Sequence, residues 1–277
     1  MRNQTTVRDF RCIQPKLKCL QMAAFSLVEL LAIIAVIGIL AALMLPALGK
    51  ARSRVQTLAC LNNLKQLETS CHLYSSDYSD YLPPNEAIKT VPKPGLTNAM
   101  VSVLNANSWC PGIAPSDLTP NNVQQGLIFP YNRSPFIYRC PTDNSTVNGF
   151  PGLLRTRSFA MDVSLNSDES ATTFRKFTDI HAVGPASLFV LVDDQEQDIW
   201  DATFNLTSTD GTYADYWINL PADRHNQGAN LSFADGHVEY WKWAAPKVYM
   251  GNPAPAYSEA DLADLRRLQQ HAKPDVN

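Results

Sequence analysis

The sequence predicts an α+β fold, in which one long N-terminal helix lies against a small antiparallel sheet with extended loops. Three observations favour this fold. An apolar run begins at Phe25, and apolar residues then recur at helical spacing as far as about Asp77. Further along, two alternating runs flank the pair Asp235-Gly236, a pattern that is typical of a β-hairpin. The 277 residues, 45% of them hydrophobic, suffice for one domain and an appended helix.

This pattern divides the chain into five segments. The first is a short basic leader, and the second is a membrane-spanning helix, which continues as an amphipathic helix. An exported α+β domain follows, and the chain ends in a linker and a short helix that Ser258 opens. The segments are residues 1–24, 25–48, 49–80, 81–250 and 251–277.

Composition and motifs exclude several classes of protein. The net charge of −3 gives no electrostatic reason to expect nucleic acid as a partner. The six cysteines include no CxxC pair, which argues against a zinc site or a thioredoxin-like centre. The sequence contains no HExxH, no nucleophile-elbow serine and no glycine-rich phosphate loop. We therefore do not expect an enzyme.

The run from Phe25 to Leu48 contains one charged residue, Glu29. At about 1.5 Å per residue, a helix of this length spans the roughly 30 Å hydrocarbon core of a membrane. A helix in a soluble core would carry a polar stripe, which this run lacks. The alternative, a secretory signal peptide, would have a shorter apolar region followed by a small-residue cleavage site. The run therefore predicts a single-pass membrane protein.

Basic residues on both sides of the run bear on its orientation. Those in the leader favour a cytoplasmic N-terminus and an exported domain, whereas those beyond the run act against this orientation. The first group is Arg2, Arg8, Arg11, Lys16 and Lys18, and the second is Lys50, Arg52 and Arg54.

Glu29 has two interpretations. A carboxylate inside an apolar helix costs free energy in lipid, and less so near the membrane edge, where it would be an interfacial acid. In the second interpretation it has a partner, the freed α-amino group at Phe25 of a neighbouring helix.

The start of the run resembles the prepilin signature of type IV pilins and type II secretion pseudopilins, through the residues Ala23-Ala24-Phe25-Ser26-Leu27-Val28-Glu29-Leu30. The resemblance implies that a membrane peptidase cuts between Ala24 and Phe25 and methylates the new N-terminus. Glu29 and Pro46 would then stand fifth and 22nd in the mature chain, where this family has its glutamate and often a helix-kinking proline. The residue before the cut is usually glycine and is Ala24 here.

The same resemblance implies a pilin-like fold and a place in the inner membrane, with the exported domain in the periplasm. It implies a structural subunit of a type II secretion pseudopilus or a type IV pilus-like fibre. The implied partners are other pilin-like subunits, bound through the N-terminal helix, the prepilin peptidase, and an inner-membrane assembly platform.

In the exported domain, Cys110 and Cys140 each precede a proline in a loop. In an oxidising compartment a bridge between them would close a loop of about 30 residues and stabilise the domain by about 3 kcal/mol. The alternative is two buried free thiols. The run from Ser187 to Val192 predicts a central strand that is covered on both faces.

An acidic loop follows this strand. Carboxylates of this kind suit calcium, which takes six to eight oxygen ligands in irregular geometry. The spacing does not match an EF-hand loop, so an ordinary solvated loop is the alternative. Major pseudopilins bind calcium in a C-terminal acidic loop, which favours calcium by analogy. The candidate ligands are Asp193, Asp194, Glu196 and Asp198.

The predicted hairpin has Asp235-Gly236 as a two-residue type I′ turn, which places Phe233 opposite Val238. His225 stands ten residues before Asp235. This His-nine-Asp-Gly spacing resembles the processing-associated motif of prepilin-type proteins with large exported domains. We interpret the motif as structural. A metal or catalytic site that includes His225, Asp235 and His237 is the alternative.

Two rival functions make different structural predictions. An anchored envelope-binding protein, which would use the aromatic hairpin, predicts that Trp241 or Trp243 is exposed. A membrane-tethered metal-dependent enzyme predicts that His225, Asp235 and one of Asp193 or Asp194 converge.

Overall fold

The computed structural model describes residues 26–86, 88–92, 100–167, 173–180 and 184–272. The chain divides into two units, residues 1–49 and residues 50–277. The predicted cleavage position between Ala24 and Phe25 lies outside the described residues.

A single helix, α1, extends over Leu27–Asp77 and confirms the predicted long N-terminal helix. It begins with a capping box. The backbone N–H of Ser26 donates to Glu29 Oε2 at 2.9 Å, and the N–H of Glu29 donates to Ser26 Oγ at 3.2 Å. The helix continues through Pro46, and the predicted kink at Pro46 stays a prediction.

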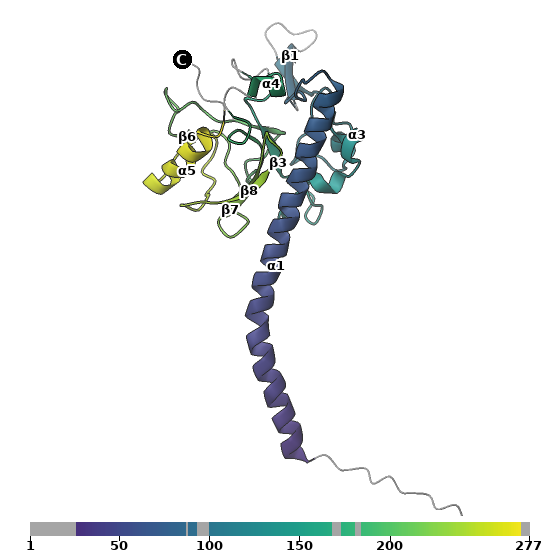
Figure 1. Ribbon diagram of the computed structural model, residues 1–277, viewed down its shortest axis with the longest axis vertical. Helices are drawn as coiled ribbons and strands as arrows, with labels where there is room; N and C mark the ends of the chain where they lie inside the picture. The colour runs from purple at the N-terminus through teal and green to yellow at the C-terminus, as the bar shows by residue number, and fades with distance from the viewer. Residues whose placement is uncertain (1–25, 87, 93–99, 168–172, 181–183, 273–277) are drawn as a thin grey trace, which may run out of the picture. The chain divides into compact units, whose positions relative to one another are not determined.

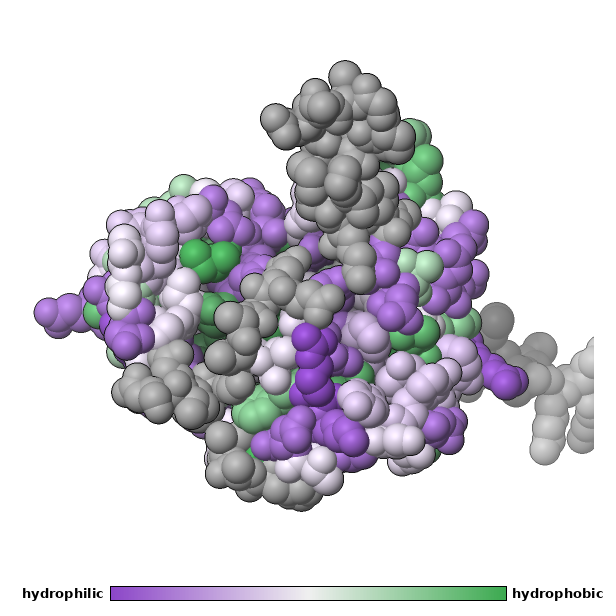
Figure 2. Space-filling view, turned by 90° about the horizontal axis from the view of Figure 1, so that it is seen from above, coloured by the Kyte–Doolittle hydropathy of each residue, from purple (hydrophilic) through white to green (hydrophobic). Residues whose placement is uncertain are grey.

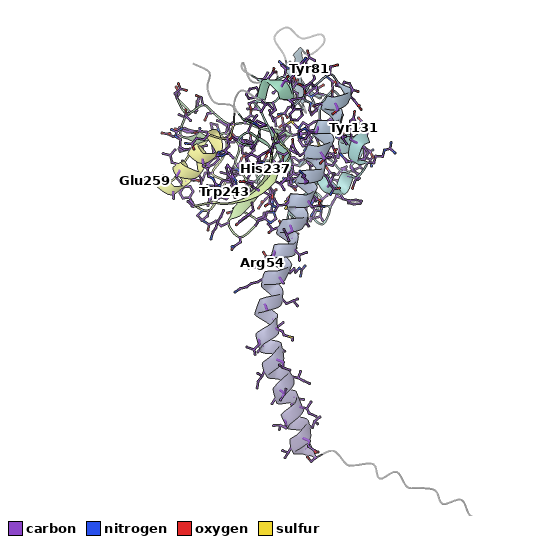
Figure 3. All side chains as sticks on the ribbon, viewed as in Figure 1. Arg54, Tyr81, Tyr131, His237, Trp243 and Glu259 are labelled. Atoms are coloured by element: carbon purple, nitrogen blue, oxygen red, sulfur yellow. The ribbon has the colours of Figure 1, made fainter. Side chains whose placement is uncertain are left out.

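In the first unit, the large apolar side chains of α1 are exposed around the whole helix. Leu27 is 78% exposed, Ile37 58% and Leu48 68%. Figure 3 shows side chains projecting to both sides of the ribbon along this part of α1.

In the second unit, the part of α1 beyond Lys50 buries one face. The buried residues recur every three or four positions, as expected for a helix packed along one stripe. They are Cys60, Leu64, Leu67, Cys71 and Tyr74. Val55 and Leu58, two of the apolar residues that recur at helical spacing in the sequence, remain exposed.

The main sheet has five strands in the order β5-β3-β4-β7-β8. Neighbouring strands are antiparallel except β3 and β5, which are parallel. The strands are β3 (Phe159–Asp162), β4 (Phe189–Asp193), β5 (Thr203–Phe204), β7 (Gly228–Phe233) and β8 (Val238–Lys242).

Two apolar clusters cover the two faces of this sheet. One joins the buried stripe of α1 to Met161 of β3 and Leu191 of β4. The other joins Val192 of β4 and Leu231 of β7 to α5 (Glu259–Gln269). Figure 1 shows α1 and α5 on opposite sides of the strands. All five residues of β4 are buried, which confirms the predicted central strand.

The predicted hairpin is present as β7 and β8, but its predicted register is wrong by one residue. Ser232 pairs with Val238, and the N–H of Phe233 donates to the carbonyl of His237 at 3.0 Å. The turn therefore has three residues, of which Gly236 has a φ of +87°. Three-residue hairpin loops of this kind place glycine at the left-handed position, so Asp-Gly suits this turn as well as the two-residue one.

Short elements surround the main sheet. The C-terminal helix α5 has Ser258 as its N-cap, whose hydroxyl accepts from the N–H of Asp261 at 3.2 Å. Two further pairs of strands are β1 (Ile88–Pro92) with β2 (Met100–Leu104), and β6 (Tyr216–Trp217) with β9 (Ala254–Pro255). The short helices are α2 (Asn121–Gln124), α3 (Phe129–Asn132), η1 (Pro135–Tyr138) and α4 (Phe177–Ile180).

Trp241 and Trp243 are both buried, at 2% and 1% exposure. Figure 3 shows Trp243 inside the body of the domain. The indole N–H of Trp243 donates to the carbonyl of Ala222 at 2.8 Å, so its polar atom is also satisfied within the fold. The exposed tryptophan that the binding-protein alternative predicts is therefore not found at either position.

Candidate metal centre

Four buried side chains from distant parts of the chain converge beside α1. Cys60 lies on α1, Cys140 follows η1, Asp193 ends β4, and His225 precedes β7. One ligand atom from each of the four lies within 4.8 Å of all the others. Two thiols, a carboxylate and an imidazole thus share one enclosed position.

The distances within this cluster are close to those of a tetrahedral site. Cys140 Sγ lies 3.2 Å from His225 Nε2, which lies 3.4 Å from Asp193 Oδ2. Cys60 Sγ lies 4.0 Å from the same carboxylate oxygen. Zinc bonds of about 2.0–2.3 Å in tetrahedral geometry place the ligand atoms roughly 3.3–3.8 Å apart. To match these separations, the three distances in the cluster would need to change by only a few tenths of an ångström.

Local structure positions His225 at the start of the hairpin. Its backbone N–H donates to the carbonyl of Gly228 at 3.3 Å, across a turn in which Asn226 and Gln227 have φ of 57° and 61°. This turn ends the loop before β7 and directs the imidazole inward, so that the ring is buried.

Thr57 sets the orientation of the imidazole ring of His225. Thr57 Oγ1 donates to the carbonyl of Ser53 at 3.1 Å and lies 3.2 Å from His225 Nδ1. Because the hydroxyl proton is used in the first bond, its oxygen is left to accept from Nδ1–H. With a metal ion bound in place of the Nε2 proton, this orientation would present the lone pair of Nε2 to the cluster, as in metal-bound histidines whose other nitrogen donates to an outer partner.

Arg224 holds the carboxylate of Asp193 in a similar way. Its guanidinium donates to Asp193 Oδ1 and, at 2.9 Å, to Glu196 Oε2. Oδ2 of Asp193 is the oxygen that faces the cluster. One carboxylate oxygen is thus fixed by the arginine and the other is available as a ligand.

The cluster shifts the protonation of its own members. A hydrogen bond from Cys60 lowers the pKa of Cys140 to about 6. Burial raises the pKa of Cys60 well above its ordinary value. For His225, burial acts to lower the pKa, but hydrogen bonds and charge from Asp193 and Cys140 outweigh it and raise the pKa to about 9. Without a cation, the groups share protons, which a metal ion would displace.

Among the described residues, the four carboxylates of the predicted calcium site do not gather into one cluster of ligand atoms. Asp194 accepts from the N–H of Gln195 at 2.8 Å, and Asp198 accepts from Asn252 Nδ2 at 3.2 Å. Glu196 pairs with Arg224. Asp193 is the member of the set that joins the cysteine–histidine cluster. Protein donors thus bind Glu196, Asp198 and Oδ1 of Asp194, whereas Oδ2 of Asp194 is buried without a hydrogen-bond partner.

The structure separates the two ends of the His-nine-Asp-Gly motif. His225 joins the cluster, whereas Asp235 lies in the hairpin turn, where it accepts from the N–H of His237 at 3.0 Å. Lys65 of α1 donates to the carbonyl of Gly236 in that turn. His225 and Asp193 converge as the tethered-enzyme alternative predicts, but Asp235 does not join them.

The predicted bridge between Cys110 and Cys140 is not formed in this structure, and both cysteines are free. Cys110 Sγ lies 3.5 Å from Arg157 Nη1. Cys140 Sγ faces His225 and Cys60 instead. The two thiols therefore have separate environments.

Sequence reasoning connects His225 with Asp193 or Asp194 in the tethered-enzyme alternative, but it joins neither Cys140 nor Cys60 to them. The sequence predicts no role for Cys60, which lies on the predicted long helix, and the lack of a CxxC pair argues against zinc. The two cysteines are far apart in sequence, and tertiary packing brings them together. No motif of closely spaced residues could therefore have predicted that these four side chains lie together.

Comparison with known proteins gives no relative. No family model matches the chain, and neither a curated protein nor a solved structure does.

Proposed function

We propose that the chain is a pilin-like structural subunit, which a membrane helix anchors and which assembles side by side with other copies through that helix. The observation that carries the proposal is that the large apolar side chains of α1 from Leu27 to Leu48 are exposed. A helix that is apolar all round needs lipid or other helices to cover it.

The helix meets the requirements of a membrane anchor. Among the described residues, α1 is the helix that is long and apolar enough to cross a membrane, and its apolar window is 0% buried. Helices of this kind also occur as signal sequences, so the anchor depends on retention of the segment in the mature protein. In the proposed topology, the second unit lies outside the cytoplasm, in the periplasm.

The domain surface supports the division of roles between the two units. On the face that Figure 2 shows, polar residues predominate and hydrophobic residues form small separate patches. Such a surface suits contact with water. Assembly is therefore better supported through the helix than through this face.

Glu29 gives the assembly its proposed polar contact. In the single chain its carboxylate is used in the capping box with Ser26. After cleavage before Phe25, the amine of a neighbouring subunit would offer the charge partner that an acid inside lipid needs. Prepilin peptidase, other subunits and an inner-membrane platform are the partners of this proposal.

An enzymatic role has less support. The four side chains of the cluster are all buried, and a site with four protein ligands is typical of a structural rather than a catalytic metal. We therefore propose no catalytic activity.

Two variants separate assembly from helix capping. A photo-crosslinking residue at Ile34, which is 60% exposed on α1, should give ladders of crosslinked copies in membranes. Glu29→Ala should retain membrane insertion and abolish the ladders, because the neighbour's amine loses its partner. Ser26→Ala removes the hydroxyl of the same capping box and keeps the carboxylate, so it should assemble normally.

The same probe at Lys242, an exposed residue of β8, is the control and should give monomers. Equal ladders in wild type and Glu29→Ala, or loss of ladders in Ser26→Ala as well, would contradict the assembly role of Glu29. Monomers alone from position 34 in the wild type would contradict assembly itself.

A further inference from the structure

We propose that Cys60, Cys140, Asp193 and His225 bind one zinc ion, which fastens α1 to the exported domain. This inference concerns the second unit and is independent of the pilin-like role.

The ligand types favour zinc over other common cations. Thiolate and imidazole ligands select zinc, whereas calcium and magnesium take oxygen ligands. The separations of 3.2, 3.4 and 4.0 Å lie within a few tenths of an ångström of those around a tetrahedral ion with two sulfur, one nitrogen and one oxygen ligand. All four positions come from the protein, which is typical of a structural site.

The surroundings complete the site. Thr57 fixes the imidazole, and Arg224 fixes the carboxylate, as outer partners of metal ligands do. A zinc ion with two thiolates and one carboxylate has a single net negative charge, and the buried guanidinium of Arg224 lies beside it. A cleft of about 730 Å³, lined in part by Thr57, His225 and Tyr240, opens next to the ring and gives an ion access.

A disulfide between Cys60 and Cys140 is the competing use of the two thiols. The structure has both as free cysteines. The carboxylate of Asp193 and the ring of His225 also face these two sulfur atoms. The sulfur atoms of a disulfide would offer neither group a charged partner or a strong hydrogen bond. The convergence of all four groups is explained by a cation and not by a bridge.

The position of the site gives it a mechanical role. Its ligands come from α1, the loop after η1, the end of β4 and the turn before β7. One ion would therefore connect the helix that leads to the membrane with the centre of the sheet. A closed site of this kind contributes to folding.

Elemental analysis of the full-length protein tests the site directly. The chain is purified in detergent under reducing conditions and dialysed against zinc-free buffer. We expect one tightly held zinc ion per chain. After chelation, added cobalt should give the visible absorption bands of tetrahedral thiolate coordination. Chelation should lower the melting midpoint by at least about 5 °C.

Matched cysteine variants separate ligation from burial. Cys60→Ser and Cys71→Ser each change a fully buried cysteine of α1, but only Cys60 belongs to the cluster. Cys60→Ser and His225→Ala should lose the zinc, and Cys71→Ser should keep it.

If a ligand variant does not fold, the metal content and the cobalt spectrum of the wild-type protein still test the proposal. No zinc in the folded wild type, together with no cobalt bands, would overturn the proposal. An intact mass that shows a Cys60–Cys140 disulfide in protein isolated without a reductant, and no bound metal, would overturn it too. Zinc retained by folded Cys60→Ser would assign the ion to other residues.

Discussion

At the scale of single residues, the fold buries several ionisable groups against α1. Glu68 is fully buried on the face of α1 that packs on the sheet. Its Oε2 accepts from Ser232 Oγ of β7 at 2.9 Å, and its Oε1 lies 3.6 Å from His72 Nε2. Burial raises the pKa of Glu68 to about 8, although Ser232 and the charge of Lys65 act in the opposite sense. The carboxyl is thus neutral in the folded chain at neutral pH.

This shift predicts a pH-dependent stability. In the unfolded chain Glu68 ionises near its ordinary pKa of 4.5. Its contribution to stability is therefore fully present below about pH 4.5 and is lost as the pH rises through about 8. The side chain of Glu68→Gln cannot ionise. When the pH is raised from 5 to 9, the free energy of unfolding should therefore fall less in this variant than in wild type, and the difference between the two falls should be about 2 kcal/mol or more.

Thermal melts of the full-length chain at both pH values measure this difference. Glu239→Gln, which changes an exposed acid on β8, is the control and should follow wild type. An identical pH dependence in wild type and Glu68→Gln would show that Glu68 is ionised in the folded chain.

At the scale of secondary-structure elements, periodicity predicted what depends on local sequence. It predicted α1, the buried strand β4, the β7–β8 hairpin and the helix α5. The hairpin register was not predicted, because Asp235-Gly236 fits both a two-residue and a three-residue turn. The cluster around Cys60 was not predicted either, because its ligands meet only through packing between four separate elements.

The three-residue turn makes a specific prediction for Gly236. A Cβ at this position would lie 3.5 Å from Lys65 Nζ and 3.6 Å from His72 Nε2, which are ordinary contacts. The cost of a side chain therefore comes from the φ of +87°. Gly236→Val should lose at least about 2 kcal/mol of stability, whereas Gly236→Asn should lose about 1 kcal/mol or less, because asparagine tolerates this region.

Chemical denaturation of the two variants measures these losses. Equal losses for valine and asparagine would mean that contacts, and not backbone conformation, set the cost at this turn.

At the scale of the whole molecule, the two units have opposite relations to water. The first half of α1 exposes apolar side chains around the helix, and the second unit has two buried apolar clusters on either side of its sheet. A chain of this kind needs lipid or neighbouring helices around its N-terminal half. In the proposed function, lipid and neighbouring helices cover this half, the leader is removed and the helix is retained.

The N-terminus of the mature membrane form tests this proposal most directly. Intact mass and N-terminal sequencing of the protein from native membranes should show a chain that begins at Phe25 with a methylated amine. Retention of residues 1–24, or a cut beyond Leu45 that removes the apolar segment, would contradict the proposal that the chain is a processed pilin-like subunit.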